Sequence, residues 1–288
     1  MSEQNQTPPK KILESSPMSG IAVPIAIVLV GALIIFGVTK MLSSGKNHRD
    51  LIDEMNSKTF GNRWVAAYEL SKFLAGNKIP KEDIPWVIEN LISVYETSAD
   101  ANTRNFVVVA LGSLNNPLCV DLLNKALKDP DPKTRFNAIA ALGNMPKGTA
   151  IDWVEMEHLV KQTDDIGAKH AALLTLASHD YEGVEQFAQG LLQYSEKTVR
   201  YAAATILIKY KKEEALPTLN EIMGLRYDVA QAGEFNGAQV EGLKINVLDF
   251  IEKYQWKQMT DWVSQIEKND TNVKVATKAK QVVNVLKN

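Results

Sequence analysis

Six basic residues recur along the sequence at intervals that would place their side chains in one line on a protein built from repeats. They are Arg63, Arg104, Arg135, Lys169, Arg200 and Lys244. Guanidinium and ammonium groups bind carboxylates, so such a line could form a basic stripe that binds an acidic or anionic peptide segment. The same side chains could instead pair with neighbours between the repeats and bury their aliphatic stems there. We favour this second interpretation and keep the first as the alternative.

The other side chains with catalytic potential lack the spacing that catalysis or metal binding requires. Histidines three or four residues apart would share a helix face as metal ligands, and no two of the four have that spacing: His48, His158, His170 and His179. The single cysteine, Cys119, lies between Leu118 and Val120 and is expected to be buried and apolar in character. Glycine-rich nucleotide loops and the GxSxG motif are absent. We therefore predict no catalytic, cofactor-binding or metal-binding residues, no small-molecule substrate and no enzyme activity.

Each basic residue of the row is followed by a small or β-branched residue three positions later and by Leu or Ile seven positions later, as in Arg135, Ala138 and Leu142. Spacings of three and seven lie on one face of a helix, so the pattern predicts a helix that packs this face against its neighbours. The basic residues are 41, 31, 34, 31 and 44 positions apart, as expected for stacked helix pairs. We predict an all-α fold, a right-handed α-solenoid of about seven helix pairs.

The inner helices of these pairs are expected at residues 60–75, 102–114, 131–145, 165–178, 196–210, 237–253 and 271–287. The turn before the third has clear cap chemistry: Pro130 ends one helix, Asp131 caps the next, and Pro132 takes the first helical position. In the last helix Gln281 replaces the core Leu, as a capping repeat requires. All five tryptophans are expected in the core: Trp64, Trp86, Trp153, Trp256 and Trp262.

One connection is much longer than the others. Residues 224–237 join the two helices of the sixth pair and are about ten residues longer than the other turns. Long insertions in repeat arrays tend to lie on one face and to carry function. We therefore add Arg226, Tyr227 and Phe235 to the basic row as a candidate interaction surface.

The amino-terminal part of the sequence predicts a membrane anchor. Residues 1–17 are polar and contain three prolines, which predicts a disordered tail. Residues 18–42 are expected to form a transmembrane helix, with Ile21 to Val38 in contact with the lipid bilayer. The uncharged stretch from Ser15 to Thr39 would span roughly 37 Å as a helix, against about 30 Å for a bilayer core. A cleaved signal peptide and a buried core helix are the alternatives.

A linker at residues 43–46 would join this anchor to a repeat domain at residues 47–288. Lys10 and Lys11 precede the span, whereas Lys40, Lys46 and Arg49 follow it. The positive-inside rule therefore predicts a single-pass protein of the cell membrane whose repeat domain faces the cytoplasm, with the opposite orientation as the alternative.

The charge balance argues against a nucleic acid partner. The chain carries 32 Lys and Arg against 34 Asp and Glu, a formal net charge of -2, and from residue 47 onward 28 face 32. Binding to nucleic acid depends on a basic surface that neutralises phosphates. We expect the partner to be a protein.

The stretch from Pro117 to Met145 resembles a HEAT repeat, most closely the short HEAT-like kind found in phycobilisome lyases and many bacterial proteins. Weaker copies cover about 47 to 288. The residues that carry the resemblance are Ala110 to Leu114, Leu122 to Asp131, Arg135, Ala138, Ala141, Leu142 and Gly143.

The repeat array, the single anchor and the lack of catalytic residues predict a membrane-anchored scaffold or adaptor for another protein. The family resemblance implies an alternative, a lyase or lyase subunit acting on a bilin-like chromophore or chromoprotein, and a weaker one, a nucleic-acid binder of the alkylpurine-glycosylase type. HEAT repeats often pair an Asp in the turn with the basic residue six positions later, which implies a pair of Asp129 with Arg135. Other repeats have Ser57, Ser98, Thr163 and Tyr194 at that position.

Overall fold

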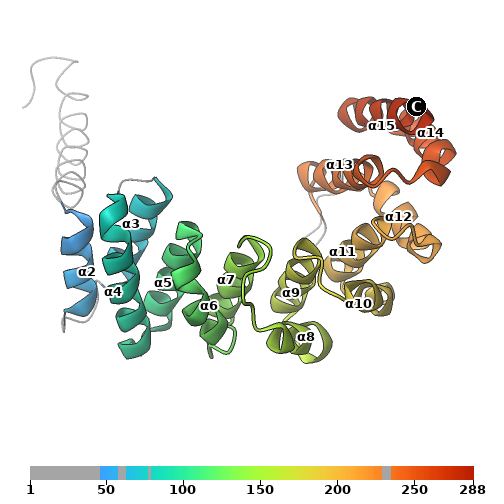
Figure 1. Ribbon diagram of the computed structural model, residues 1–288. Coiled ribbons are helices and arrows are strands. Elements are labelled where there is room, and N and C mark those ends of the chain that lie inside the picture. Colours follow the sequence, from blue (N-terminus) through green and yellow to red (C-terminus); the bar gives the residue numbers. More distant parts are fainter. Residues whose placement is uncertain (1–45, 58–62, 77–78, 229–234) are drawn as a thin grey trace, which may run out of the picture. The chain divides into compact units, whose positions relative to one another are not determined.

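The computed structural model describes residues 46–57, 63–76, 79–228 and 235–288, and all regular secondary structure in these ranges is helical (Figure 1). The helix pairs lie in the compact unit Leu51–Asn288, apart from the start of the first helix at His48. Within the described ranges no helix has both the length and the apolar character needed to cross a bilayer. The tail predicted at residues 1–17 and the transmembrane helix predicted at residues 18–42 lie outside these ranges.

Fourteen α-helices of the described residues follow one another as seven pairs, as the sequence predicted. They are α2 (His48–Asn56) and α3 (Arg63–Ala75), α4 (Ile84–Thr97) and α5 (Ala101–Leu114), α6 (Val120–Ala126) and α7 (Pro132–Gly143), α8 (Trp153–Gln162) and α9 (Ile166–Ser178), α10 (Val184–Leu191) and α11 (Lys197–Ile208), α12 (Leu216–Met223) and α13 (Gly237–Lys253), and α14 (Thr260–Asn269) and α15 (Val273–Lys287). Short 3-10 turns, Lys81–Asp83, Pro117–Cys119, Glu213–Ala215 and Lys257–Met259, lead into α4, α6, α12 and α14.

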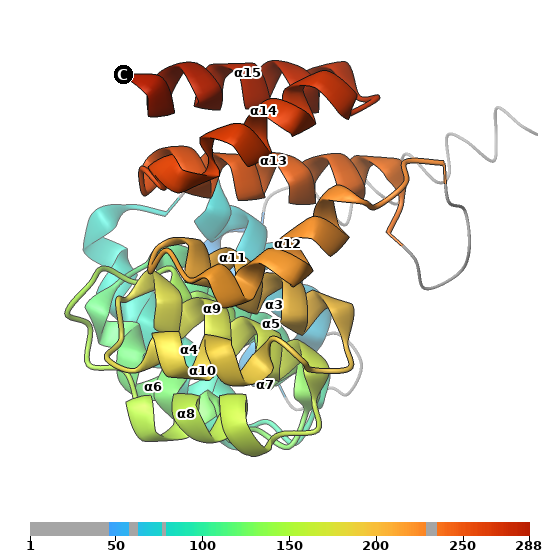
Figure 2. The same cartoon turned by 90° about the vertical axis from the view of Figure 1, so that its right-hand side faces the viewer.

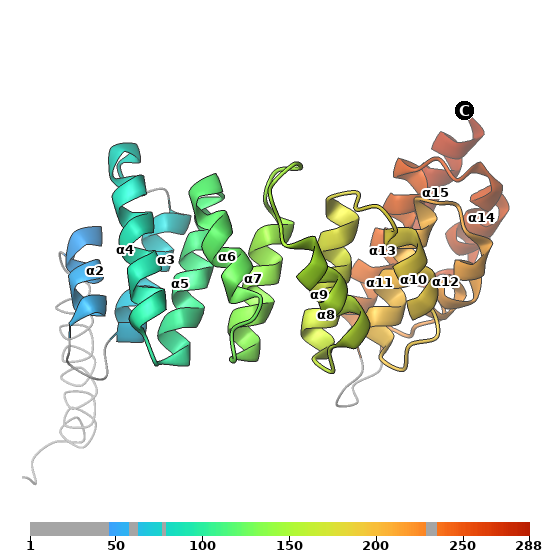
Figure 3. The same cartoon turned by 60° about the horizontal axis from the view of Figure 1, so that its bottom comes forward.

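The odd-numbered helices from α3 to α15 form one layer, in which each helix contacts the next odd-numbered one. The even-numbered helices from α4 to α14 each pack on their odd-numbered partner, and Figure 3 shows the pairs following one another in chain order. The predicted inner helices are the odd-numbered ones. The right hand of the solenoid stays a prediction.

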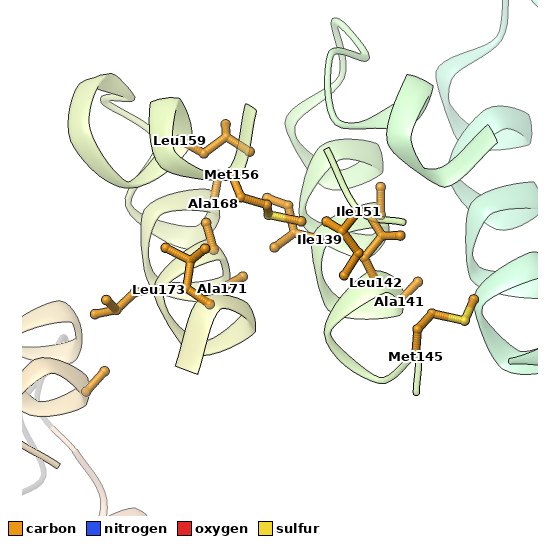
Figure 4. Packing of buried hydrophobic residues seen from close by; sticks show 14 of the residues in the cluster. Ile139, Ala141, Leu142, Met145, Ile151, Met156, Leu159, Ala168, Ala171 and Leu173 are labelled. Carbon is orange, nitrogen blue, oxygen red and sulfur yellow. The ribbon is translucent and has the colours of Figure 1, made fainter. Parts of the chain in front are cut away.

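The core lies between the two layers and runs through the whole array. Ala138 and Leu142 of α7, three and seven positions after Arg135, are fully buried, as the helical pattern predicted. Figure 4 shows this packing around α7, where Met156 of α8 lies beside Ile139 and Ala168. Small residues let the odd-numbered helices approach closely, since a Cβ added to Gly112 of α5 would lie 2.6 Å from the Cβ of Ala141.

Side-chain caps fix where most of the odd-numbered helices begin. Asp131 accepts from the N–H of Thr134 and Pro132 is the first residue of α7, as predicted. Asp100 caps α5, Asp165 caps α9 and Asn236 caps α13 in the same way. Each cap satisfies first-turn N–H groups that would otherwise lack a partner, and a carboxylate also interacts favourably with the helix dipole.

The last pair closes the array at its carboxyl end. In Figure 2, α13 and α15 run alongside each other and α14 lies beside α15, in agreement with the contacts among the three helices. Gln281 is exposed on α15, whereas Val275, Ala279 and Val282 are buried against the neighbouring helices. The outward face is therefore polar at its centre, as expected for a terminal repeat.

Candidate functional site

The basic row of the odd-numbered helices lies where one repeat meets the next. Arg104 shows the arrangement most completely. Its Nη1 donates to the main-chain carbonyls of Ser98 and Ala99, at 3.2 and 3.1 Å, in the turn before its own helix. Its Nε and Nη2 donate to the two carboxylate oxygens of Asp129 in the following repeat, at 2.8 and 3.0 Å. One guanidinium group thus fastens its own turn and the next repeat together.

Asp129 is the buried centre of this arrangement. The hydroxyl of Tyr95 donates to Asp129 at 2.7 Å, and the main-chain N–H of Asp131 donates at 2.9 Å. Burial alone would raise the pKa of Asp129, but the hydrogen bonds from Arg104 and Tyr95 outweigh burial and hold that pKa below its usual value. Asp129 is therefore a carboxylate in the folded protein, paired with a cation that cannot be deprotonated.

Three further basic residues reach an acidic residue of the following repeat. Arg135 donates to Asp165 at 3.1 Å, Arg200 to Glu221 at 2.8 Å and Lys244 to Asp270 at 3.0 Å. Together with Arg104 and Asp129 these pairs form a series that we call the ladder. The ladder agrees with the interpretation of the basic row as packing between repeats.

The ladder corrects the pairing that the family resemblance implied for Asp129. Arg135 does contact the residue six positions earlier, but its Nη1 donates to the main-chain carbonyl of Asp129, at 2.9 Å. The side chain of Asp129 is turned away to Arg104 of the previous repeat. Because the contact uses a carbonyl, it tolerates any side chain at that position. Arg200 accordingly makes the same contact with the carbonyl of Tyr194, at 2.7 Å.

Lys169 is buried without a carboxylate within hydrogen-bonding distance among the described residues. Its ammonium group donates to the main-chain carbonyl of Val160 at 2.5 Å and lies 5.3 Å from the ring centroid of Tyr194. Burial lowers the pKa of Lys169, and the carboxylate of Asp164 opposes that effect. A cation–π contact with Tyr194 thus stands where other repeats have an ion pair.

Arg63 begins the basic row in the first repeat. Its Nε donates to the main-chain carbonyl of Ser57 at 2.8 Å, the equivalent of the turn contacts of Arg104 and Arg135. All six residues of the basic row therefore make structural contacts within the array. The alternative interpretation, in which they form a binding stripe, stays a prediction.

The described ends of the insertion, residues 224–228 and 235–236, fold back onto the array. Tyr227 covers the ion pair of Lys244 and Asp270 in the ladder. Its ring centroid lies 4.3 Å from the Lys244 ammonium, and its hydroxyl donates to Asp270 at 2.7 Å. Burial, reinforced by the hydrogen bond to Asp270, raises the pKa of Tyr227. Arg226 is exposed and paired with Asp228 at 2.8 Å. Gly237 passes so close to Tyr227 that a Cβ there would lie 2.8 Å from its carbonyl oxygen.

Phe235, the third candidate residue of the insertion, packs on the odd-numbered layer. Its ring centroid lies 5.8 Å from that of Tyr201 on α11. Tyr201 in turn donates to Glu221 at 2.8 Å, beside Arg200. The structure thus joins the predicted candidates into two groups, Lys244 with Tyr227 and Arg200 with Phe235 through Tyr201.

A cavity of about 600 Å³ lies next to the first of these groups. Its lining includes Arg226, Tyr227, Lys244, Trp262 and Asp270. The indole N–H of Trp262 donates to Asn220 at 2.7 Å, so this tryptophan is held by a polar contact and is only half-buried.

Apolar side chains on the odd-numbered layer are the surface feature that sequence reasoning missed. Trp64 is 43% exposed, Phe136 42% and Leu174 43%, on α3, α7 and α9. Trp64 stacks on Phe106 of α5 at a centroid distance of 6.2 Å, and the exposed ring of Tyr68 lies tilted against Phe106 at 5.3 Å. We call these residues the apolar row: Trp64, Tyr68, Phe106, Phe136 and Leu174.

The apolar row corrects the expectation that all five tryptophans lie in the core. Trp256 is buried, but Trp64 is exposed, because it follows Arg63 by one position. On a helix that turns about 100° per residue, positions one and five after the basic residue lie opposite positions three and seven. Large apolar residues at those positions, Trp64, Tyr68, Phe136 and Leu174, were the sequence signal for this row.

The histidines and the cysteine form no site in the described residues. Cys119 is buried, as expected, and burial raises the pKa of its thiol to about 11, so it is a poor nucleophile. His179 contacts the carbonyl of Leu142 at 3.0 Å and the ring of Trp153, while burial lowers the pKa of His170. Across residues 46–57, 63–76, 79–228 and 235–288, no three His, Cys, Asp or Glu side chains are grouped as metal ligands would be.

Similarity to known proteins supports the repeat interpretation. The sequence pattern of the HEAT repeats matches residues 88–166, the stretch that contains Arg104, Asp129, Arg135 and Asp165. The solved structure of YibA from E. coli is similar at a TM-score of 0.57 and 15% identity, covering 85% of this chain and 84% of YibA.

A second similar structure is that of the complex of CpcE and CpcF of phycocyanin lyase from Nostoc sp. PCC7120. Its TM-score is 0.54 at 16% identity, and the match covers 84% of this chain and 95% of that one. No curated protein matches the sequence. At these identities the two structures establish that the chain is a helical-repeat array of HEAT-like type, and they speak for its fold alone.

Proposed function

We propose that this protein is a membrane-anchored helical-repeat scaffold that binds other proteins. The observation that carries the proposal is a contrast between two sets of side chains. The charged groups of the basic row are occupied by contacts within and between repeats, whereas large apolar side chains are exposed on α3, α7 and α9. Repeat arrays of this kind offer extended surfaces to partners. The proposal assigns no catalytic step and no cofactor to the chain.

The anchor in this proposal is the uncharged segment at residues 18–42, with Ile21 to Val38 in the bilayer. The excess of Lys and Arg after the span supports a cytoplasmic repeat domain. Anchoring would raise the effective concentration of the array near partners at the same membrane.

The test is a protease applied to intact cells or spheroplasts and to lysed ones, with the chain followed by an antibody to its carboxyl terminus. Recovery in the membrane pellet after carbonate washing, with digestion only after lysis, is the expected result. A chain released by carbonate would contradict the anchor, and digestion in intact spheroplasts would reverse the orientation. A tag pulldown from the matching compartment then tests for protein partners.

A second candidate function, that of a bilin lyase or lyase subunit, has one observation in its favour, the similarity in fold to the CpcE and CpcF complex. Absorbance spectra of a free bilin with and without the purified chain test it. Under the scaffold proposal the spectrum does not change, whereas a shift that saturates with the chain would favour the lyase function.

A further inference from the structure

The apolar row follows the register of the repeats. Trp64 and Phe136 each lie one position after the basic residue of their repeat, and Tyr68 and Leu174 lie five positions after it. Single exposed apolar residues are ordinary on protein surfaces, but a set repeated in register on three helices, with the partly exposed Phe106 of α5 between them, forms a candidate interface. The row therefore has the character of a binding surface.

The fifth repeat shows how this chain itself covers the same position. Tyr201 lies one position after Arg200, in register with Trp64 and Phe136, but is only 1% exposed. Phe235, from the non-helical end of the insertion, packs on its ring. On α11, an aromatic side chain from an irregular segment therefore covers the aromatic residue that follows the basic residue. No described aromatic residue covers Phe136 on α7 in this way.

Polar groups beside Phe136 complement an extended backbone. Asn137 Nδ2 donates to Asn105 Oδ1 at 2.7 Å, which links α5 to α7. This single bond leaves the Nδ2 donor of Asn105 and the Oδ1 acceptor of Asn137 for another group. One donor and one acceptor side by side match the carbonyl and N–H of a peptide unit.

The same place is hollowed and carries a positive charge. A groove of about 330 Å³ is lined by Asn105, Asn137, Phe136 and Lys133. Gly167 of α9 borders it, where a Cβ would lie 3.6 Å from the ring of Phe136. Asp165, also at the groove, is paired with Arg135, whereas Lys133 is exposed and has no ionic partner among the described residues. An acidic group would be favoured next to the aromatic contact.

We propose that the apolar row, together with Asn105, Asn137 and Lys133, binds an extended segment of a partner protein that carries aromatic side chains and an acidic residue. The inference rests on the proposed scaffold function and names the surface and the partner chemistry for it. Adjacent packed helices lie about 10 Å apart and an extended chain rises about 3.3 Å per residue. The aromatic residues of the bound segment therefore recur about every third residue.

The experiment is selection of a phage library of random 12-residue peptides on the full-length chain held in lipid nanodiscs, with empty nanodiscs as the blank. The expected result is a family of peptides that share aromatic residues about three positions apart and a neighbouring acidic residue. A synthetic peptide with the consensus sequence then serves as the probe for titration.

Variants tie this binding to the row. Phe136→Ser and Asn137→Ala each weaken the consensus peptide at least tenfold, and Lys133→Gln weakens it about threefold and reduces its dependence on salt. Val154→Ser is the matched control, because Val154 is 82% exposed but lies on α8, in the even-numbered layer. It leaves the affinity unchanged, and far-UV circular dichroism checks that all four variants are folded.

The other outcomes separate this inference from the scaffold function. Peptides whose affinity is unchanged by Phe136→Ser would leave a scaffold with a different surface and overturn the inference. A chain that selects no peptide and captures no partner would contradict both. If Phe136→Ser instead converts a dimer to a monomer, the apolar row binds a second copy of the chain. If it abolishes binding to empty vesicles, the apolar row binds a lipid surface. Either result would contradict the inference.

Discussion

At the scale of single residues, the charged side chains of this array form ion pairs, and the contribution of each pair to stability depends on how deeply it is buried. Arg104 and Asp129 lie inside the protein, while Lys125 and Glu96 form an exposed pair at 2.8 Å. An exposed pair contributes little, because water screens it and both side chains lose freedom. Removing one member of a buried pair leaves the other charge without compensation.

We predict that Asp129→Asn lowers the free energy of unfolding by about 3 kcal/mol, because the guanidinium of Arg104 then lacks its carboxylate. Glu96→Gln, which removes the exposed pair with Lys125, is the control and changes the free energy by less than about 0.5 kcal/mol. Urea unfolding followed by circular dichroism measures both. Equal costs for the two variants would contradict the role assigned to Asp129.

Lys169 leads to the opposite expectation for a buried charge. It donates to a main-chain carbonyl and not to a carboxylate, so Lys169→Met breaks no hydrogen-bonded ion pair, removes a desolvated ammonium and keeps the aliphatic packing. We predict a free energy of unfolding that is unchanged or about 1 kcal/mol higher. Arg104→Met is the comparison. It lowers the free energy of unfolding by about 3 kcal/mol, since it leaves the buried carboxylate of Asp129 without its cation. A large loss in Lys169→Met would mean that the contacts with Val160 and Tyr194 outweigh desolvation.

At the scale of the helices, the spacing of the odd-numbered layer depends on small residues at its contacts. Gly112 faces Ala141 across α5 and α7, and Gly143 faces Thr175 across α7 and α9, where added Cβ atoms would lie 2.6 and 2.7 Å from their neighbours. Gly242 on α13 has no such neighbour within 4 Å.

We predict that the same substitution has opposite signs at two of these positions. Gly112→Ala lowers the free energy of unfolding by about 1–3 kcal/mol, because its methyl group pushes α5 away from α7. Gly242→Ala raises it by about 0.5–1 kcal/mol, because alanine favours the helix and nothing obstructs its side chain. Thermal unfolding of the two variants beside the wild type gives the answer, and a stabilised Gly112→Ala would show that α5 and α7 can move apart freely.

The helices were predictable from the sequence, whereas the partners of their polar side chains were not. The three-and-seven spacing located the odd-numbered helices to within a few residues, and Asp131 and Pro132 marked the start of α7, since caps and periodicity act within one element. Asp129 pairs with a residue 25 positions earlier, and that choice depends on how two repeats stack. The exposure of Trp64 likewise depends on which face its neighbours leave open.

At the scale of the whole molecule, the ladder makes the array sensitive to acid. Burial by itself would raise the pKa of Asp129, Glu221 and Asp270, but hydrogen bonds from their basic and tyrosine partners outweigh burial and lower all three pKa values. Their usual values are 3.8 for Asp and 4.5 for Glu. Carboxylates with lowered pKa values stabilise the folded state only while they are ionised.

We predict that this contribution to stability is complete above about pH 5 and is lost as the pH falls through the lowered pKa values, because the unfolded chain then binds more protons than the folded one. Melting temperatures between pH 7 and pH 3 measure the loss. The double variant with Asp129→Asn and Asp270→Asn starts from a lower melting temperature but declines less steeply in acid. Parallel curves for the variant and the wild type would exclude the ladder as the cause.

The ladder also has a consequence for synthesis on the ribosome. Each basic residue precedes its acidic partner in the chain, by 25 residues for Arg104, 30 for Arg135, 21 for Arg200 and 26 for Lys244. At about 5–20 residues per second, the partner is translated roughly one to six seconds later. During that interval the newest repeat exposes an unpaired cation, which opposes burial of its open face until the next repeat emerges. The nascent chain is thereby biased towards stacking in order, one repeat at a time.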